Sequence, residues 1–546
     1  MASEAGPGPV QGGRAASPAA LPFGRIRSAP GKESLYDMRA VPELSAKFTR
    51  ASATRALELG ALTLVLLLGT ALRLELLAER TLWHDEAFSL AVARRPAGYI
   101  LRHLPAADPH PPGYYLLLRS ALVLFGDSLA VARGLSAVLG VLAVWLTWAL
   151  GRRLFDPATG LAAAGLVALH PFQIFSSNEI RMYPLATCLA LLSTWAAWRA
   201  VKDGRMRDWA AYGVSLAAMA YVSYYTVVVA LGQWAVLLGR RRGLAVALAV
   251  GALIYSPWLG SVPRETPGIV FVRERPELRH ALELLATQAY GGYLFGTTTY
   301  LSGSGLDAVQ HGMLLVPFLV LMAAGSAAIW RTDPHGAALV SGVWLGGVVA
   351  AVLASAALGH LAAYPHHLVF LQPFAALLIG AGIVHLKEIV ERARKAVVVG
   401  AAAVAVLSFL SPAVTNLQGS PEYQVFRYDR AAAYVRALYR TGDALVFYQA
   451  GAQHVFREYF DPGGVQIGID PEFTRWSREG MRPVLKRAVG ALREVRGRVW
   501  LVLVGPYPEN SPLDLIEAIE GFGFRRVTRR NFGGVEVVVL TRPARR

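Results

Sequence analysis

The sequence predicts a mainly α-helical, polytopic membrane protein with a small C-terminal α/β domain. Hydrophobic residues make up 54% of the 546 residues, charged residues only 17%, and the mean hydropathy is +0.40. One soluble core could not bury so much apolar surface. About eleven apolar runs of spanning or nearly spanning length follow one another. Beyond the last of them, strand and helix patterns alternate.

The N-terminal end is polar and irregular. Residues 1–50 are rich in Gly, Pro, Ala and Ser and offer no face that could pack, so we expect a disordered cytoplasmic tail. The first apolar run reaches spanning length, which predicts an uncleaved anchor and no cleavable signal peptide. The single cysteine, Cys188, lies in an apolar run and is interpreted as a small buried side chain.

Residues 51–411 are predicted to form the transmembrane domain. The candidate spans are residues 56–77, 129–150, 159–176, 184–199, 209–224, 226–239, 243–260, 311–330, 337–358, 368–386 and 396–411. A further run, residues 113–125, is short and contains Arg119. That run suits a helix in the membrane interface better than a full span.

Basic residues decide the orientation of these helices. The net charge of +17 would suggest nucleic acid binding in a soluble protein, but the charge lies in short clusters between apolar runs. If residues 113–125 do not span, the clusters near residues 152, 205, 241, 331 and 391 share one side, and the opposite hairpins carry only Arg181. The rule that basic loops stay in the cytoplasm therefore places loops 78–128 and 261–310 outside the cytoplasmic membrane.

The same count places residues 412–546 outside, as an extracytoplasmic α/β domain. Its predicted elements are a helix at 429–440, a strand at 444–448, a helix at 481–495, a strand at 499–504, a helix at 512–521 and a closing strand pair ending at 535–540.

The polar residues that a membrane helix or its short loops tolerate least all fall on this outer side. They are Asp85, Glu86, Asp108, His110, Arg133, Asn178, Glu179, Arg181, Tyr183, His360, Tyr364, His366 and His367. Incidental polarity would be divided between the two faces, whereas a site for a membrane-anchored substrate gathers its charges at one surface. This convergence predicts a catalytic site.

Asp85 and Glu86 are adjacent, so on a helix their side chains point roughly 100° apart and cannot share one role. We expect one of them to do the chemistry and the other to position it; the alternative is a helix that merely begins with favourable acidic residues. Asp108 and His110 stand in a proline-rich segment that holds the histidine rigidly, either against substrate or as a helix cap.

Arg133, Arg181, His366 and His367 are candidate ligands for an anion, because a guanidinium group is a planar fork that matches phosphate. The alternatives are an ion pair between Arg181 and Glu179 that ends a helix, and an Arg133 side chain that reaches the interface.

One ordered set of motifs resembles the polyprenyl-phosphate-sugar-dependent glycosyltransferases of the GT-C superfamily, in the protein O-mannosyltransferase and aminoarabinose-transferase branch (glycosyltransferase family 39-like). The motifs are Arg73-Leu74, residues 82–87, residues 108–115, Phe125-Gly126-Asp127-Ser128, Ala132-Arg133 and residues 178–183. The resemblance covers about residues 55–260. It implies that Asp85 is the catalytic acidic residue of the first external loop and that Arg133 lies near the lipid phosphate.

The chain also departs from that family. His110 stands where aminoarabinose transferases have a lysine, and Tyr364-Pro365-His366-His367 replaces an Arg-Tyr pair of many relatives. The β-trefoil domain of eukaryotic protein O-mannosyltransferases is missing, which argues against a protein acceptor.

The expected activity is transfer of a sugar, with inversion, from a polyprenyl-phosphate donor to a hydroxyl of an envelope glycan, lipid or protein. Membrane lipid is the surrounding partner and nucleic acid is not expected. His84, Asp85, Glu86, Asp108 and His110 could hold a divalent ion, but two external arginines favour a reaction without metal or other cofactor. The competing functions are a transporter or flippase for lipid-linked sugar and a non-catalytic envelope scaffold.

Overall fold

The computed structural model describes residues 40–75, 77, 81–108, 110–261, 278–290, 308–358, 365–389, 426–448, 451–469, 489–504 and 511–543. The predicted tail before residue 40, the predicted span 396–411, most of the loop 261–310, and the candidate residues His360 and Tyr364 lie outside these residues. The chain divides into Met1–Leu57 and Glu58–Arg546.

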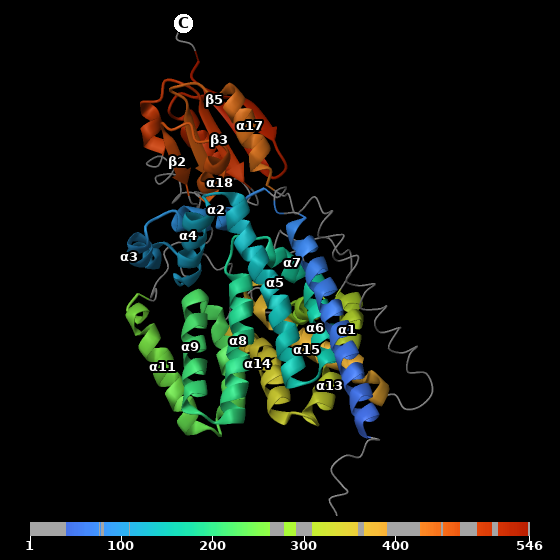
Figure 1. Cartoon of the computed structure of the whole chain (residues 1–546). Helices are drawn as coiled ribbons and strands as arrows, with labels where there is room; N and C mark the ends of the chain where they lie inside the picture. Colours follow the sequence, from blue (N-terminus) through green and yellow to red (C-terminus); the bar gives the residue numbers. More distant parts are fainter. Residues whose placement is uncertain are drawn as a thin grey trace, which may run out of the picture. The chain divides into compact units, whose positions relative to one another are not determined.

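Helices occupy every predicted span that the structure describes. They are α1 (Ala40–Leu74), α5 (Leu129–Leu154), α6 (Pro157–Leu169), α7 (Pro171–Ser177), α8 (Tyr183–Asp203), α9 (Met206–Val222), α10 (Val227–Leu237), α11 (Arg241–Leu259), α13 (Ala308–Trp330), α14 (Pro334–Leu358) and α15 (Gln372–Ile389). The 3-10 helices η1 (Tyr224–Thr226) and η2 (Pro365–Leu371) precede α10 and α15. Figure 1 shows α8 beside α5, α9 and α14, which it contacts.

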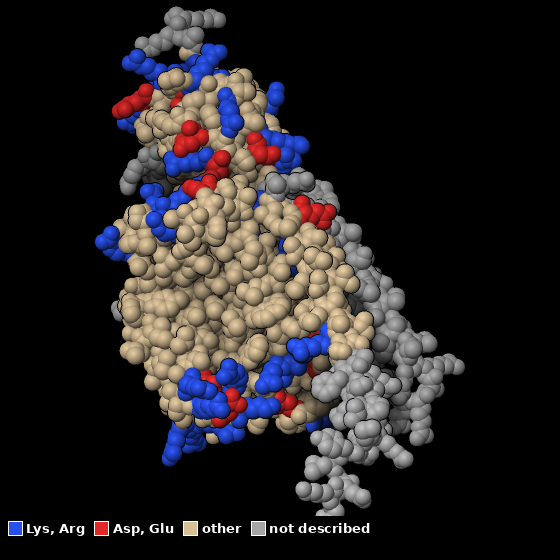
Figure 2. All heavy atoms as spheres, in the orientation of Figure 1, with Lys and Arg blue, Asp and Glu red and all other residues tan. Residues whose placement is uncertain are grey.

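Of the described helices, five are long and apolar enough to cross a membrane, or six if α6 and α7 form one bent span. The predicted count of about eleven is therefore not confirmed, although the helical class is. Figure 2 shows a nearly uncharged belt on this face of the molecule, with charged side chains gathered on either side of it. Such a belt is what a protein needs where lipid surrounds it.

Residues 159–176 were predicted as one helix, but the structure breaks it into α6 and α7, bent by 63°. His170 adopts an extended conformation (ψ 120°) and Pro171 opens the second helix, because proline cannot donate the backbone hydrogen bond that would continue the first. The buried Arg73 side chain donates to the backbone oxygens of Val167 and Ala168, at 3.2 and 3.1 Å. After the break, α7 ends at Ser177, and residues 178–182 form the loop that leads into α8.

Gly140 allows α5 to approach this break closely. A Cβ atom at this position would stand 2.1 Å from Ser177 Oγ and 2.9 Å from Arg73 Nε. Arg73 Nε itself donates to Ser177 Oγ at 3.1 Å. Only glycine therefore fits where α5, Ser177 and Arg73 meet.

The predicted loop 78–128 contains three helices, α2 (His84–Ala93), α3 (Ala97–Ala107) and α4 (Gly113–Phe125). The predicted short helix at 113–125 is confirmed. A further helix, α12 (Leu278–Tyr290), lies within the second predicted loop.

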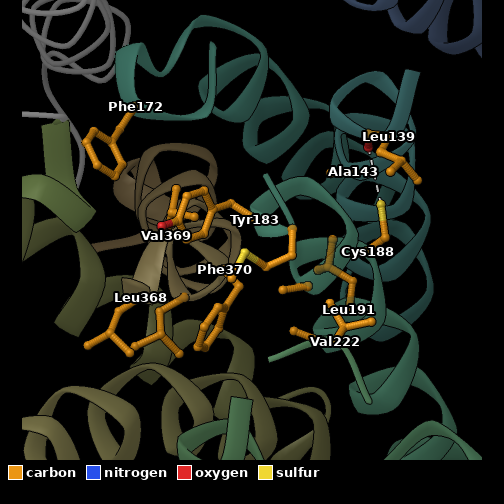
Figure 3. Packing of buried hydrophobic residues seen from close by; sticks show 14 of the residues in the cluster. Leu139, Ala143, Phe172, Tyr183, Cys188, Leu191, Val222, Leu368, Val369 and Phe370 are labelled. Atoms are coloured by element: carbon orange, nitrogen blue, oxygen red, sulfur yellow. Dashed lines mark hydrogen bonds between the residues drawn. The ribbon is translucent and has the colours of Figure 1, made fainter. Parts of the chain in front are cut away.

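The buried packing of the helix bundle surrounds the single cysteine (Figure 3). Cys188 on α8 is buried, as expected, and its Sγ contacts the backbone oxygen of Leu139 on α5 at 3.2 Å. Leu191 lies one turn further along α8 in the same cluster.

The C-terminal region is an α/β unit. Its elements are α17 (Tyr428–Leu438), β1 (Ala444–Tyr448), α18 (Gly451–Tyr459), β2 (Gln466–Ile469), η4 (Val489–Arg493), β3 (Val499–Val504), α20 (Ser511–Glu520), β4 (Arg525–Asn531) and β5 (Val535–Thr541). The strand order is β2-β1-β3-β5-β4, with β2, β1 and β3 parallel and the last two pairs antiparallel. The predicted strands at 444–448 and 499–504 are confirmed, whereas α18 and β2 were not predicted. Of the predicted helix at 481–495, the part before residue 489 lies outside the described residues.

Both faces of this sheet are buried, which explains why its central strands are continuously apolar. Leu445 and Phe447 pack into the cluster that also contains Val455 of α18, while Val446 packs with Leu515 of α20 on the other face. The sheet therefore has a helical layer on each side.

We predict that Gly140→Val destabilises the protein, because the added side chain must displace Ser177 and Arg73; overpacking of a core costs about 1–3 kcal/mol. Gly134→Val is the matched control, since Gly134 lies on the same helix and a Cβ atom added there would meet nothing within 4 Å. The measurement is thermal unfolding in detergent. Unfolding is detected by the reaction of the Cys188 thiol, which is buried in the folded protein, with a fluorogenic maleimide. Equal unfolding temperatures for the two variants would contradict the close approach.

Candidate functional site

The first turn of α2 separates its two carboxylates. Glu86 is fully buried, whereas the side chain of Asp85 is 31% exposed. The N-cap residue is Trp83, whose backbone is extended and whose side chain makes no cap hydrogen bond. Asp85 and Glu86 therefore have different surroundings, as adjacent positions on a helix require.

Glu86 is held by a bidentate ion pair with the buried Arg133 of α5. Arg133 Nε donates to Oε1 and Nη2 to Oε2, each at 3.1 Å. The backbone N–H groups of Ile180 and Trp83 also donate to this carboxylate, at 3.2 and 3.4 Å, and Arg133 Nη1 donates to the backbone oxygen of Leu77 at 3.0 Å. Glu86 thus ties α2 to α5 and to the 178–182 loop.

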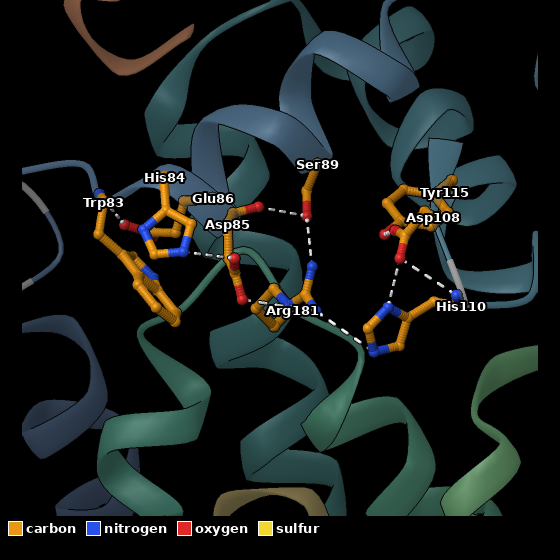
Figure 4. A network of polar contacts seen from close by, with 9 residues as sticks. All are labelled: Trp83, His84, Asp85, Glu86, Ser89, Asp108, His110, Tyr115 and Arg181. Carbon is orange, nitrogen blue, oxygen red and sulfur yellow. Dashed lines mark hydrogen bonds and ion pairs between the residues drawn. The ribbon is translucent and has the colours of Figure 1, made fainter. Parts of the chain in front are cut away.

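Asp85 faces the guanidinium group of Arg181, and Figure 4 shows Arg181 between Asp85 and His110. Arg181 Nη2 lies 3.6 Å from Asp85 Oδ2, and His84 Nε2 lies 3.1 Å from Asp85 Oδ1. Burial would raise the pKa of Asp85, but the charges of Arg181 and His84 outweigh it and hold that pKa well below its usual range. Asp85 is therefore an ionised carboxylate at neutral pH.

Arg181 is buried and its contacts are long. Besides Asp85, its Nη1 contacts Ser89 Oγ at 3.4 Å and its Nη2 contacts His110 Nε2 at 3.5 Å. Its Nε has no hydrogen-bond partner among the described residues. A buried cation whose contacts with Asp85, Ser89 and His110 are long, and whose Nε has no partner among the described residues, has capacity left for an anionic ligand.

His110 is oriented by Asp108. His110 Nδ1 lies 2.6 Å from Asp108 Oδ1, and the Tyr115 hydroxyl donates to Asp108 Oδ2. Because Arg181 can only donate, the facing Nε2 of His110 accepts and the ring proton sits on Nδ1. Burial would raise the pKa of Asp108, but the hydrogen bond from His110, the charge of Arg181 and the hydrogen bond from Tyr115 lower that pKa overall. Asp108 fixes the tautomer in which Nε2 faces Arg181.

The segment at the start of η2 lies next to this network. The His366 ring is 6.0 Å from the Tyr183 ring, edge to face, and the His367 ring stacks on Tyr225 at 4.3 Å. His366 is also within electrostatic range of Asp85 and Arg181. Glu179 is buried in the 178–182 loop.

The structure therefore places Asp85, Arg181, His110 and Asp108 in one connected network and Glu86 with Arg133 directly beside it. Tyr183, His366 and His367 form an adjoining aromatic group. Glu179 shares the loop of Arg181, and its charge also acts on Arg133.

Two side chains of this network were not singled out in the sequence. Ser89 lies four residues after Asp85 on the same face of α2, so it could have been found once α2 was recognised as a helix. Tyr115 carries no such signal, because its contact with Asp108 depends on the turn before α4.

Within the described part of the chain, no three His, Cys, Asp or Glu side chains are grouped so that they could hold a metal ion. The carboxylates of the site are instead engaged by cations and donors of the protein, Asp85 by Arg181 and His84, and Glu86 by Arg133.

Comparison with known proteins gives a family match over part of the chain. Residues 109–260 match the family model described as dolichyl-phosphate-mannose-protein mannosyltransferase. No curated protein sequence gives a significant match.

Solved structures of low sequence identity share the fold. ArnT from Cupriavidus metallidurans in the apo state is 14% identical, with a TM-score of 0.57 over 90% of this chain and 98% of that one. The same protein bound to undecaprenyl phosphate has a TM-score of 0.56 at 13% identity, with the same coverage. The oligosaccharyltransferase of Archaeoglobus fulgidus in the apo form is 15% identical, with a TM-score of 0.54 over 82% of this chain and 69% of that one.

These neighbours are GT-C glycosyltransferases. The helical fold with its small C-terminal sheet domain is therefore that of the expected superfamily. The likeness to these structures shows the fold, and the match to the mannosyltransferase family model covers residues 109–260.

Proposed function

We propose that the protein is an integral-membrane glycosyltransferase that moves a sugar from a polyprenyl-phosphate donor to an acceptor hydroxyl, with inversion. The observation that carries this proposal is the pairing of a partly exposed carboxylate, Asp85, with the buried Arg181, whose Nε lacks a partner among the described residues. The binding of undecaprenyl phosphate by the structurally similar ArnT supports the choice of donor.

In the proposed reaction the acceptor oxygen attacks the anomeric carbon of the donor sugar. The bond between that carbon and the phosphate oxygen breaks, and its electron pair leaves with the polyprenyl phosphate. Asp85 takes the proton of the acceptor hydroxyl. Because phosphate is already a good leaving group, one carboxylate base suffices, whereas glycosidases need two carboxyl groups.

Arg181 would stabilise the negative charge that gathers on the departing phosphate. Its burial strengthens such a contact, because the surroundings screen charge less than water does. The His110 ring, oriented by Asp108, supports Arg181 on its other side.

The low pKa of Asp85 bears directly on its role as a base. While the positive charge of Arg181 acts on Asp85 without a phosphate to neutralise it, the carboxylate is a weak base. A donor phosphate on Arg181 would neutralise part of that cation and raise the pKa of Asp85. Donor binding would thus make Asp85 a better base at the moment when it is needed.

Glu86 and Arg133 have a different role in this proposal. Their bidentate pair and its backbone donors leave Glu86 no room to act as a base. We assign both to positioning α2 and the 178–182 loop. Tyr183, Glu179, His366 and His367 are assigned to substrate contact beside Arg181.

The basic clusters predict a location in the cytoplasmic membrane, with this site and the C-terminal α/β unit on the outer side. The acceptor would be a hydroxyl of an envelope glycan, lipid or protein.

Incubation of purified protein with a radiolabelled prenyl-phosphate sugar tests the activity. Label that leaves the lipid supports a transferase. Label that crosses the bilayer still attached to lipid identifies a flippase, and label that does neither indicates a scaffold.

Replacing Asp85 with Asn should leave donor binding intact but lower kcat on the order of a hundredfold or more, because the base is lost while the shape is kept. Asp203→Asn is the control, since Asp203 is an exposed aspartate at the far end of α8. Turnover is measured with the labelled donor and binding by competition. Wild-type turnover in the Asp85 variant would refute its assignment as the base.

Replacing Arg181 with Gln should lower turnover and move the acidic limb of the pH profile of activity to higher pH. The wild-type pKa of Asp85 is depressed by Arg181, so removal of that charge raises it and Asp85 is protonated earlier as the pH falls. Arg102→Gln, at an exposed arginine of α3, is the control. An unshifted acidic limb would show that Arg181 does not set the pKa of the base.

We further propose that the reaction needs no metal ion, since two arginines supply the positive charge near the site. The initial rate should then be unchanged in EDTA. Loss of activity that magnesium or manganese restores would reverse this proposal.

A further inference from the structure

Helix α18 of the C-terminal α/β unit packs directly against α2, the helix that carries Asp85. Near the start of α2, the backbone N–H of Leu82 donates to the Tyr459 hydroxyl at 2.9 Å. In the middle of α2, the Phe88 ring contacts the ring of His454 of α18 edge to face, with the ring centroids 6.5 Å apart.

At the end of α2, Arg94 forms a two-pronged ion pair with Glu458 of α18, with Nη2 to Oε2 at 3.1 Å. The Nε of the same arginine donates to Asp127 at 3.0 Å, just before α5 begins. The C-terminal end of the helix is therefore linked both to α18 and to the segment that leads into α5.

Apolar side chains complete the contact. Leu90 of α2 belongs to the same continuous buried cluster as Ala452 and Val455 of α18. Together with the three contacts above, this places α18 against α2 from the start of α2 to its end.

The helix α2 needs such support for a physical reason. It has only ten residues, and the hydrogen bond from the backbone N–H of its N-cap, Trp83, to the Glu86 carboxylate is long, at 3.4 Å. Helices of this length are marginal in water and depend on packing for their stability. The Leu82-Trp83 segment that Tyr459 holds is directly followed by the turn that carries Asp85 and Glu86.

We propose that α18 is a positioning element of the transferase site, in which Tyr459 and Glu458 hold the two ends of α2 so that Asp85 keeps its place opposite Arg181. This inference rests on the proposed function. It assigns the C-terminal α/β unit a part in turnover, because a small displacement of a reacting group can cost up to about a hundredfold in rate.

The first test examines the contact without using activity. A Cβ at Gly451 would lie 3.5 Å from the Cβ of His84, within the range that a disulfide spans. The double variant His84→Cys with Gly451→Cys in the full chain should form a disulfide under mild oxidation, seen as a linked peptide pair by mass spectrometry. The native Cys188 is buried and serves as an internal reference. The pair Arg102→Cys with Gly451→Cys should stay unlinked. Equal linking of both pairs, or of neither, would overturn the proposal.

The second test examines turnover. Tyr459→Phe and Glu458→Gln, combined, should lower kcat about tenfold or more while the KM for the prenyl-phosphate sugar stays within about twofold. The acidic limb of the pH profile should also shift, since Asp85 would no longer be held against Arg181, His84 and His110. Arg457→Gln is the matched control, because Arg457 is an exposed residue of the same helix that bonds Gln466 of β2.

A double variant with wild-type kcat and an unchanged pH profile would overturn the inference. So would a loss of activity that only follows the loss of folded protein, with kcat per folded molecule unchanged. Failure of the proposed function is distinguishable, because in that case the wild-type protein itself would not release label from the donor.

Discussion

The geometry of the site depends on the buried ion pair between Glu86 and Arg133. Removing either partner would leave an uncompensated charge in surroundings that screen it poorly, which costs about 3–5 kcal/mol in proteins. The pair and the Ile180 N–H join α2, α5 and the 178–182 loop at one point. Because Glu86 is fixed inward, the neighbouring Asp85 must point to the other side, where Arg181 meets it.

A second constraint sets the course of the 178–182 loop. The chain breaks its helix at His170 and Pro171, and Arg73 binds the backbone oxygens that the break leaves without partners. This interaction stabilises an early helix end. The loop that follows brings Arg181 to Asp85 and His110. The site therefore combines one tightly paired arginine, Arg133, with one loosely held arginine, Arg181, whose Nε has no partner among the described residues.

The helix that carries the proposed base is short and gains its stability from its neighbours. Contacts with α18 at Leu82, Phe88 and Arg94 connect the site to a unit more than 350 residues further along the chain. The same unit buries both faces of its sheet. The stability of α2 therefore depends on its packing against the distant α/β unit.

The sequence alone determined the helical membrane class, the short helix at 113–125, the apolar strands 444–448 and 499–504, and the grouping of Asp85, Asp108, His110 and Arg181. These features depend on composition and periodicity within a short stretch of the sequence. The sequence did not reveal the break at Pro171, helix α18 or the number of spans. Straight spans, bent spans and buried helices have similar apolar compositions, so composition does not distinguish them. The spacing of Asp85 and Glu86 indicated two different roles without assigning them, and the family resemblance implied that Asp85 is the catalytic residue. Only the tertiary structure shows that the two carboxylates have different partners, Arg181 for Asp85 and Arg133 for Glu86, because distant partners cannot be read from spacing.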